Sequence, residues 1–222
     1  MLLAVDTSTK QIGLALYDGA QVLGELLWQS QHHHTVELAP AVDRLLRNAG
    51  LGIENVQALS VALGPGSFTS LRVGLAFVKG LALARHYPIF GIPTLDVLAA
   101  SVEVGEYPLV AAIQAGRGRL AACWYLPGKD GWQAKDAAVV LTADELAEKI
   151  RKPTIVCGEL TADERQRLAR KRVNVLLRSP AQSVRRPGIL AELAWKRWQT
   201  GAGDDAASLA PIYLHVGAPI SA

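Results

Sequence analysis

Residues 64–84 read GPGSFTSLRVGLAFVKGLALA, and no other stretch of the chain is as informative. A Gly-Pro-Gly turn leads into Ser67 and Thr69, either of which can begin a helix by accepting a backbone N–H bond. The helix that follows has apolar residues on every side and is interrupted only by Arg72 and Lys79. Such a pattern predicts a buried helix that follows directly on a tight turn.

One flank of this predicted helix carries only small side chains. Ala76, Gly80 and Ala84 recur every four residues and therefore lie on the same side. Small residues at this spacing let a second backbone approach closely. In a chain of 222 residues, we expect one face of such a helix to need a partner from outside the chain.

The composition is that of an ordinary globular protein. Half of the residues are hydrophobic and the net charge is +3, so a good core is expected and charge alone does not indicate nucleic-acid binding. Cys123 and Cys157 lie in apolar runs, which favours core thiols over a disulfide or metal pair. The N-terminus lacks a basic region and no run of about 18 apolar residues occurs, so we expect a cytoplasmic protein without a signal peptide or membrane span.

Strands and helices alternate on both sides of residues 64–84. In the first half we expect three strands, a helix, a strand, the helix after residue 67, a strand and a last helix near residues 95–102. A looser version of this order begins at Pro108, after a break near Gly105. The repetition predicts two α/β lobes, residues 1–104 and 105–222, that arose by internal duplication.

Several stretches together resemble the TsaB (YeaZ) family. They are LLAVDTST at the start, HHHTVELAPAVDRLL, LGPGSFTSLRVGLAFVKGLA, GIPTLDVLAA, and PIYLH near the C-terminus. The match is dense in the first half and thin afterwards, and the long motif around GPGSFT is specific. The resemblance implies two actin-like lobes of the Hsp70 and sugar-kinase type (the ASKHA, RNase H-like fold).

The resemblance also implies a function. TsaB is the non-catalytic subunit of the bacterial machinery that transfers threonylcarbamoyl to the N6 of a tRNA adenosine. It implies direct binding to TsaD, the paralogue that carries the chemistry, and an indirect link to TsaE, an ATPase. We expect self-association when TsaD is absent, weak or indirect contact with tRNA, and no cofactor on this chain, with ATP and a metal on the partner subunits.

The same resemblance places the partner surface on the helices near residues 34–48 and 68–85. The residues expected to line it are Val36, Ala39, Val42, Leu45, Leu46, Arg72, Ala76, Gly80 and Ala84.

The chain departs from the family pattern at three places. Ser70 stands where the family usually has Gly, Gln114-Ala115-Gly116 stands where it has Asp-Ala-Arg, and His215 stands where it has Arg. The last two departures leave the details of the second lobe open.

A comparison with TsaD indicates that catalysis is absent. TsaD carries two metal-binding histidines four residues apart on one helix, and the positions here that match them are Thr94 and Leu98. Because leucine cannot bind a metal ion, we expect the catalytic centre of the paralogue to be missing.

A turn with an acid and two hydroxyls is a second candidate site. Asp6, Thr7 and Ser8 would approach a nucleotide phosphate in an actin-like kinase, together with an anion-binding turn formed by Gly64, Gly66 and Ser67. The alternative is that these residues only shape two tight turns. The residues favour the structural role, because the corresponding turn of the second lobe, QAGRG, has no carboxylate.

The residues give less support to a metal site, a tRNA-binding site or another enzymatic function. His32, His33 and His34 are adjacent and point in different directions, so they do not readily share a metal ion. A basic run over residues 165–172 would suit tRNA phosphates, but interspersed acids favour a solvated helix face. The alternative functions are a small-molecule kinase or ATPase of the same fold and, last, a peptidase. For a peptidase, Ser67 lies outside a G-x-S-x-G elbow.

Overall fold

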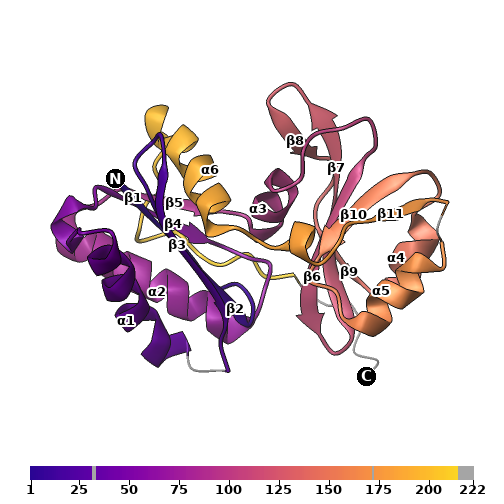
Figure 1. Cartoon of the computed structure of the whole chain (residues 1–222), viewed down its shortest axis with the longest axis horizontal. Helices are drawn as coiled ribbons and strands as arrows, with labels where there is room; N and C mark the ends of the chain where they lie inside the picture. The colour runs from indigo at the N-terminus through magenta and orange to yellow at the C-terminus, as the bar shows by residue number, and fades with distance from the viewer. Residues whose placement is uncertain (32–33, 172, 215–222) are drawn as a thin grey trace.

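A five-stranded sheet forms the first lobe in the computed structural model, which describes residues 1–31, 34–171 and 173–214 (Figure 1). Its order is β3-β2-β1-β4-β5, with antiparallel pairing among the first three strands and parallel pairing from β1 onward. The strands are β1 (Leu2–Asp6), β2 (Gln11–Tyr17), β3 (Val22–Gln29), β4 (Ala58–Ala62) and β5 (Ile89–Ile92).

Helices cover both faces of this sheet, because its central strands are apolar on both sides. Along β1, Leu3 and Val5 pack against α1 (His34–Asn48) and α2 (Phe68–Arg85), and Leu2 and Ala4 pack against α6 (Pro187–Gln199). Successive side chains of a strand point to opposite faces, so one short strand contributes to two cores. Figure 1 shows α1 and α2 on one side of the sheet and α6 on the other.

The second lobe repeats this arrangement. Along the order β11-β10-β6-β7-β8 the pairings are again antiparallel on one side of β6 and parallel on the other, and a sixth strand, β9, pairs antiparallel with β7. The strands are β6 (Leu109–Gly116), β7 (Arg119–Gly128), β8 (Gly131–Ala134), β9 (Val139–Leu141), β10 (Thr154–Gly158) and β11 (Val175–Leu177). The shared order is what a duplication predicts, and the duplication itself stays a prediction.

One helix belongs to the cores of both lobes. Helix α3 (Thr94–Ala100) lies between the two sheets (Figure 1), with Val97 in the core under α6 and Leu95 and Leu98 in a core of the second lobe. Helices α4 (Ala143–Lys149) and α5 (Ala162–Ala169) cover the other face of the second sheet.

Most elements predicted from the sequence are confirmed, including the capping box at the start of α4. Strand β8 was not predicted, because its residues, GWQA, show no apolar alternation. The division at residues 104 and 105 stays a prediction, and α6 of the later segment packs on the first sheet. Within the described residues no helix is both long and apolar enough to cross a membrane.

Within the chain α2 is not buried on every side, and its exposed side includes the small residues of the flank expected to need an outside partner. It packs on the sheet through one face, which buries Leu71, Gly74, Leu75 and Val78, among others. The opposite side is exposed: Leu83 is 69% accessible, and Ala76, Gly80 and Ala84 also lie at the surface. Two helices on one face of a five-stranded sheet have no third layer above them, so the apolar residues of α2 that point outward stay uncovered.

The two glycines of α2 differ in what surrounds them, and we expect opposite effects on stability. A Cβ at Gly74 would lie 2.2 Å from Thr7 Oγ1, whereas one at Gly80 would meet nothing within 4 Å. Gly74→Ala should therefore lower the free energy of unfolding by roughly 1–3 kcal/mol through overpacking. Gly80→Ala should raise it by about 0.8–1 kcal/mol through helix propensity. Urea unfolding of both variants would measure this, and equal shifts would contradict the packing described here.

Candidate functional site

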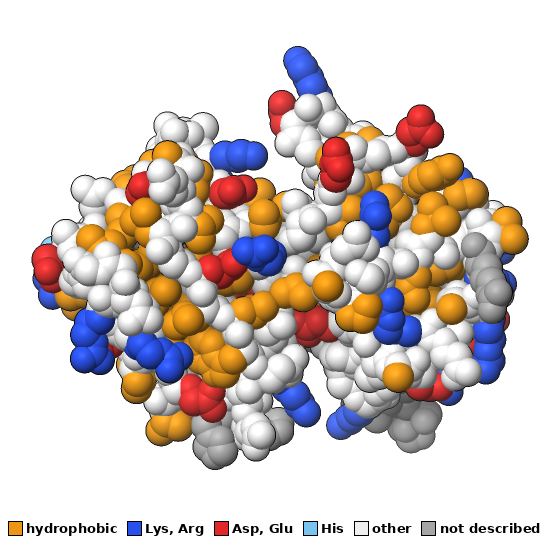
Figure 2. Space-filling model, in the orientation of Figure 1, with side chains coloured by type: hydrophobic (Ala, Val, Ile, Leu, Met, Phe, Trp, Pro, Cys, Tyr) orange, Lys and Arg blue, Asp and Glu red, His pale blue; other side chains and the backbone are white. Residues whose placement is uncertain are grey.

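The two lobes enclose a cleft of about 880 Å³. Residues of both lobes line it, including Thr9 and Gly66 from the first lobe and Gln114, Glu159 and Arg165 from the second. Figure 2 shows the surface notched between the lobes. The turn after β1 and the start of α2 meet at this cleft, so the residues predicted as a nucleotide-like turn lie beside it.

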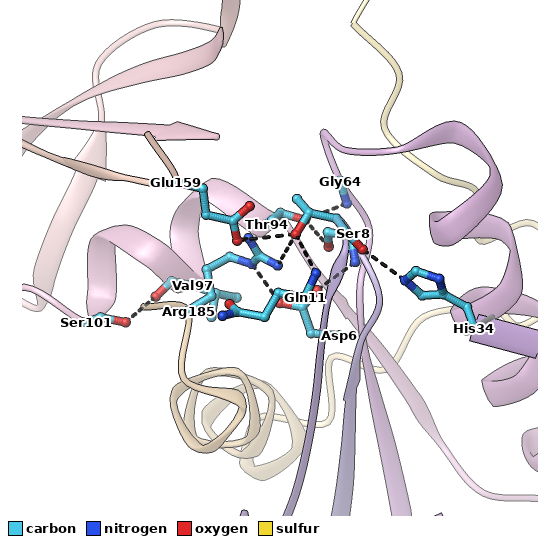
Figure 3. A network of polar contacts seen from close by, with 11 residues as sticks. Asp6, Ser8, Gln11, His34, Gly64, Thr94, Val97, Ser101, Glu159 and Arg185 are labelled. Carbon is cyan, nitrogen blue, oxygen red and sulfur yellow. Dashed lines mark hydrogen bonds and ion pairs between the residues drawn. The ribbon is translucent and has the colours of Figure 1, made fainter. Parts of the chain in front are cut away.

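Each side chain of that turn already has a partner within the chain, and Figure 3 shows the contacts of Asp6 and Ser8. The Thr7 hydroxyl donates to the Ser70 carbonyl over 2.7 Å, and Asp6 Oδ1 accepts from the Ser8 backbone N–H over 2.8 Å. Ser8 Oγ lies 2.7 Å from Thr94 Oγ1, which also accepts from the Gly64 N–H over 2.9 Å. These bonds tie the turn to α2 and α3.

The Gly-Pro-Gly turn is shaped by close backbone contact. The Ser67 N–H donates to the Ser8 carbonyl over 2.7 Å, and a Cβ at Gly66 would lie only 2.1 Å from that carbonyl oxygen. Ser67 caps α2, and the Ser70 hydroxyl donates to Ser67 Oγ over 3.0 Å. Ser70, a departure from the family pattern, is thus accommodated in the cap of α2.

Arg185 is the most deeply buried charged side chain of the site, and it was not predicted from the sequence. Its side chain is 1% exposed and donates from Nε to Asp6 Oδ2 over 2.9 Å and from Nη2 to Thr9 Oγ1 over 3.1 Å. Its Nη1 forms an ion pair with Glu159 (Figure 3). Burial alone would lower the pKa of Arg185, but the carboxylates of Asp6 and Glu159 outweigh it and raise that pKa above its usual value.

The positions that match the metal-binding histidines of TsaD are closed to a metal ion. Leu98 is fully buried in a hydrophobic core, and the Thr94 hydroxyl is used in the contacts with Ser8 and Gly64. Among the residues that the structure describes, three or more His, Cys, Asp or Glu side chains nowhere gather as a metal site would require. His34 is buried with Nε2 3.0 Å from the Thr9 carbonyl, and His32 and His33 lie outside the described residues.

In the second lobe, Gln114 occupies the position of the expected acid. Its amide donates to the Glu159 carbonyl over 3.0 Å and to Glu164 Oε2 over 2.6 Å. Glu164 in turn accepts from the Thr161 N–H at the start of α5. Gln114 therefore ties the end of β6 to α5, while His215, the other departure of this lobe, lies outside the described residues.

The remaining candidates have structural roles. Cys123 and Cys157 are buried free thiols, as predicted, and burial raises the pKa of Cys157 to about 12. Arg167 pairs with Asp144 and Asp163 on an exposed face, which agrees with the solvated helix predicted there.

The predicted partner surface is exposed only in part. Val36 is 65% accessible, and Ala39, Arg72, Ala76, Gly80 and Ala84 also reach the surface. The prediction that Val42, Leu45 and Leu46 line the partner surface is wrong, because all three are buried against the chain's own sheet.

A groove of about 450 Å³ runs between α1 and α2 on this side, lined by Ala39, Phe68, Arg72 and Ala76, among others. We call the exposed residues Val36, Ala39, Phe68, Arg72, Ala76, Gly80 and Ala84 the α1–α2 surface.

An aromatic cluster stands at one end of the α1–α2 surface. The Arg72 guanidinium lies 3.7 Å from the centre of the Phe68 ring, and its Nε donates to the Tyr213 hydroxyl over 3.0 Å. The rings of Phe68 and Tyr213 are 5.1 Å apart. Phe68 is nevertheless 54% exposed, so this cluster offers a large apolar contact of the kind that anchors protein interfaces.

Two sheets of matching strand order that face each other across a cleft define an actin-like α/β protein. The activator of 2-hydroxyisocaproyl-CoA dehydratase from Clostridium difficile, solved with bound ADPNP, shares this fold. Its TM-score is 0.56 at 9% identity, covering 90% of this chain and 96% of that one. YeaZ from Pseudomonas aeruginosa is more similar, with a TM-score of 0.78 at 27% identity over 96% of this chain and 99% of that one.

Sequence comparisons show to which family of actin-like proteins the chain belongs. A family model described as TsaD, tRNA N6-adenosine threonylcarbamoyltransferase, matches residues 28–173. The tRNA threonylcarbamoyladenosine biosynthesis protein TsaB of Haemophilus influenzae is 42% identical over 118 residues, which are 51% of this chain and 49% of that protein. The match thus spans about half the length of that relative. The chain belongs to the family of this model, within its TsaB (YeaZ) group.

The hydroxyl of Thr94 should contribute measurably to stability. In Thr94→Val the Gly64 N–H and the Ser8 hydroxyl lose a buried partner, which costs about 1–3 kcal/mol and lowers the melting temperature by roughly 5 °C. Thr69→Val is the matched control, because Thr69 is exposed on α2. Calorimetry of the two variants would test this, and indistinguishable melting temperatures would show that the contacts of Thr94 carry little energy.

Proposed function

We propose that the chain is a non-catalytic subunit of the machinery that makes threonylcarbamoyladenosine in tRNA, and that it binds TsaD through the α1–α2 surface. The chain covers only part of the curated relative that carries this function in its name. The observation that supports the proposal most directly is the pairing of an exposed helical surface with blocked catalytic positions, Thr94 and Leu98.

The α1–α2 surface has the properties of a helix-docking site. The small residues Ala76, Gly80 and Ala84 lie exposed along α2, so a partner helix can approach its backbone closely. Figure 2 shows hydrophobic side chains reaching the surface of both lobes between scattered charges. An exposed apolar surface in a soluble protein commonly marks an interface.

TsaD is the partner that this surface suits. The TsaD model matches residues 28–173, which include both α1 and α2, and this supports a matching pair of helices in TsaD. Paralogues with the same exposed helices can pair either with each other or with themselves. The surface would therefore serve a homodimer when TsaD is absent. In this proposal TsaE is reached through TsaD, ATP and a metal ion belong to the partner subunits, tRNA contact is indirect, and the complex works in the cytoplasm.

A small-molecule kinase or ATPase is the second candidate, favoured by the likeness of fold to a protein solved with bound ADPNP. Against it, Asp6 is held by Arg185, and the turn of the second lobe carries Gln114 where an acid would be needed. A peptidase is less favoured still, because Ser67 serves as the cap of α2.

We expect the purified chain to hydrolyse no ATP. The Asp6 carboxylate that would position a metal ion or water is neutralised by Arg185. Phosphate release from ATP and Mg²⁺ should equal the protein-free blank, and Asp6→Asn should behave in the same way. Steady turnover that disappears in Asp6→Asn would favour the kinase or ATPase function instead.

Gly80→Leu tests the α1–α2 surface itself. The monomer should tolerate the change, because a Cβ at this position meets nothing within 4 Å. Overpacking of a close helix contact costs roughly 1–3 kcal/mol, which corresponds to about a five- to 150-fold loss of affinity for TsaD. Co-purification with TsaD from the same organism would measure this, and light scattering of the chain alone should shift toward monomer.

Gly105→Leu is the matched control, because it adds the same side chain at another exposed glycine with nothing within 4 Å. It should leave TsaD binding and light scattering unchanged. Normal melting of Gly80→Leu together with undiminished TsaD binding would place the interface elsewhere.

A further inference from the structure

Arg185 joins the two lobes at the edge of the cleft. Its loop follows a short 3-10 helix, Ala181–Ser183, and leads directly into α6, which packs on the first sheet. Its partners in the first lobe are Asp6, the last residue of β1, and Thr9, in the turn that follows; its partner in the second lobe is Glu159, directly after β10. A single guanidinium therefore spans two segments that are more than a hundred residues apart in the chain.

The oxygens around Arg185 form a set that requires a cation. Asp6 is 2% exposed, and the guanidinium that binds it also binds Glu159, whose side chain is 21% exposed. The two carboxylates would repel each other if no positive charge stood between them. Two carboxylates and a hydroxyl are hard oxygen ligands of the kind that divalent cations prefer. In this chain the position between them is filled by a side chain whose planar fork can bond all three at once.

We infer that Arg185 is a built-in counter-cation that takes the place of a divalent metal ion and holds the two lobes at one fixed closure. The neighbouring Arg186 shows that the link between the lobes depends on where the arginine lies in the chain. Arg186 is exposed and pairs with Glu25 at the surface of the first lobe, so it makes no link between the lobes. The closure of the cleft is then independent of metal ions, and this holds whether or not the chain binds TsaD.

The inference can be tested on the whole chain by replacing each arginine. In EDTA, Arg185→Ala should melt roughly 10 °C below the wild type, because one buried partner of an ion pair is removed. Millimolar Mn²⁺ should recover part of this loss, since binding to the folded state alone stabilises it. Arg186→Ala should melt close to the wild type, and neither it nor the wild type should respond to Mn²⁺.

A double variant separates this role from simple packing. Arg185→Ala with Asp6→Asn removes one of the two carboxylates, so it should melt above Arg185→Ala and lose the response to Mn²⁺. If Arg185→Ala does not fold, the double variant should still fold, because less charge is left unpaired.

Three results would overturn the inference. The first is a lowered melting temperature of Arg185→Ala that Mn²⁺ does not raise. The second is a wild-type melting temperature that rises with Mn²⁺. The third is a double variant whose melting temperature is no higher than that of Arg185→Ala.

Discussion

The close contact between the turn after β1 and the start of α2 is the constraint on which the first lobe depends. The Ser8 carbonyl sits where a Cβ of Gly66 would be, and the Thr7 hydroxyl sits where a Cβ of Gly74 would be. Only glycine at both positions lets the helix lie this near the central strand. This close approach sets the distance between α2 and the sheet. That distance in turn decides which residues of α2 are buried and which stay exposed.

The sequence predicts most elements of both sheets, because buried parallel strands appear as short apolar runs and helix starts carry capping residues. It could not predict which apolar residues of α1 face inward. Val36 and Ala39 point to solvent and Val42, Leu45 and Leu46 to the core, yet all five recur at helical spacing. A helix with apolar residues on two sides does not reveal which side meets the sheet.

The charged cluster around Arg185, at the edge of the cleft, could not be predicted from the sequence for a similar reason. Arg185 and Arg186 are adjacent and identical in type, and only the path of the loop before α6 buries the first and exposes the second. Glu159 directly follows an apolar strand, but its partner lies 26 residues further along the chain. Local pattern carries no information about such a pairing, whereas the tight turn at residues 64–67 is encoded in neighbouring residues.

Helix α3 makes the two lobes interdependent in folding. Val97 contributes to a core of the first lobe, while Leu95 and Leu98 contribute to a core of the second. Leu190, Ala191 and Ala194 of α6 complete the first lobe from the far end of the chain. A ribosome that has released only the first hundred or so residues has therefore not yet supplied one face of the first sheet. The topological halves of this chain are thus not the units in which it acquires its stability, and cooperative unfolding of both lobes together is the natural result.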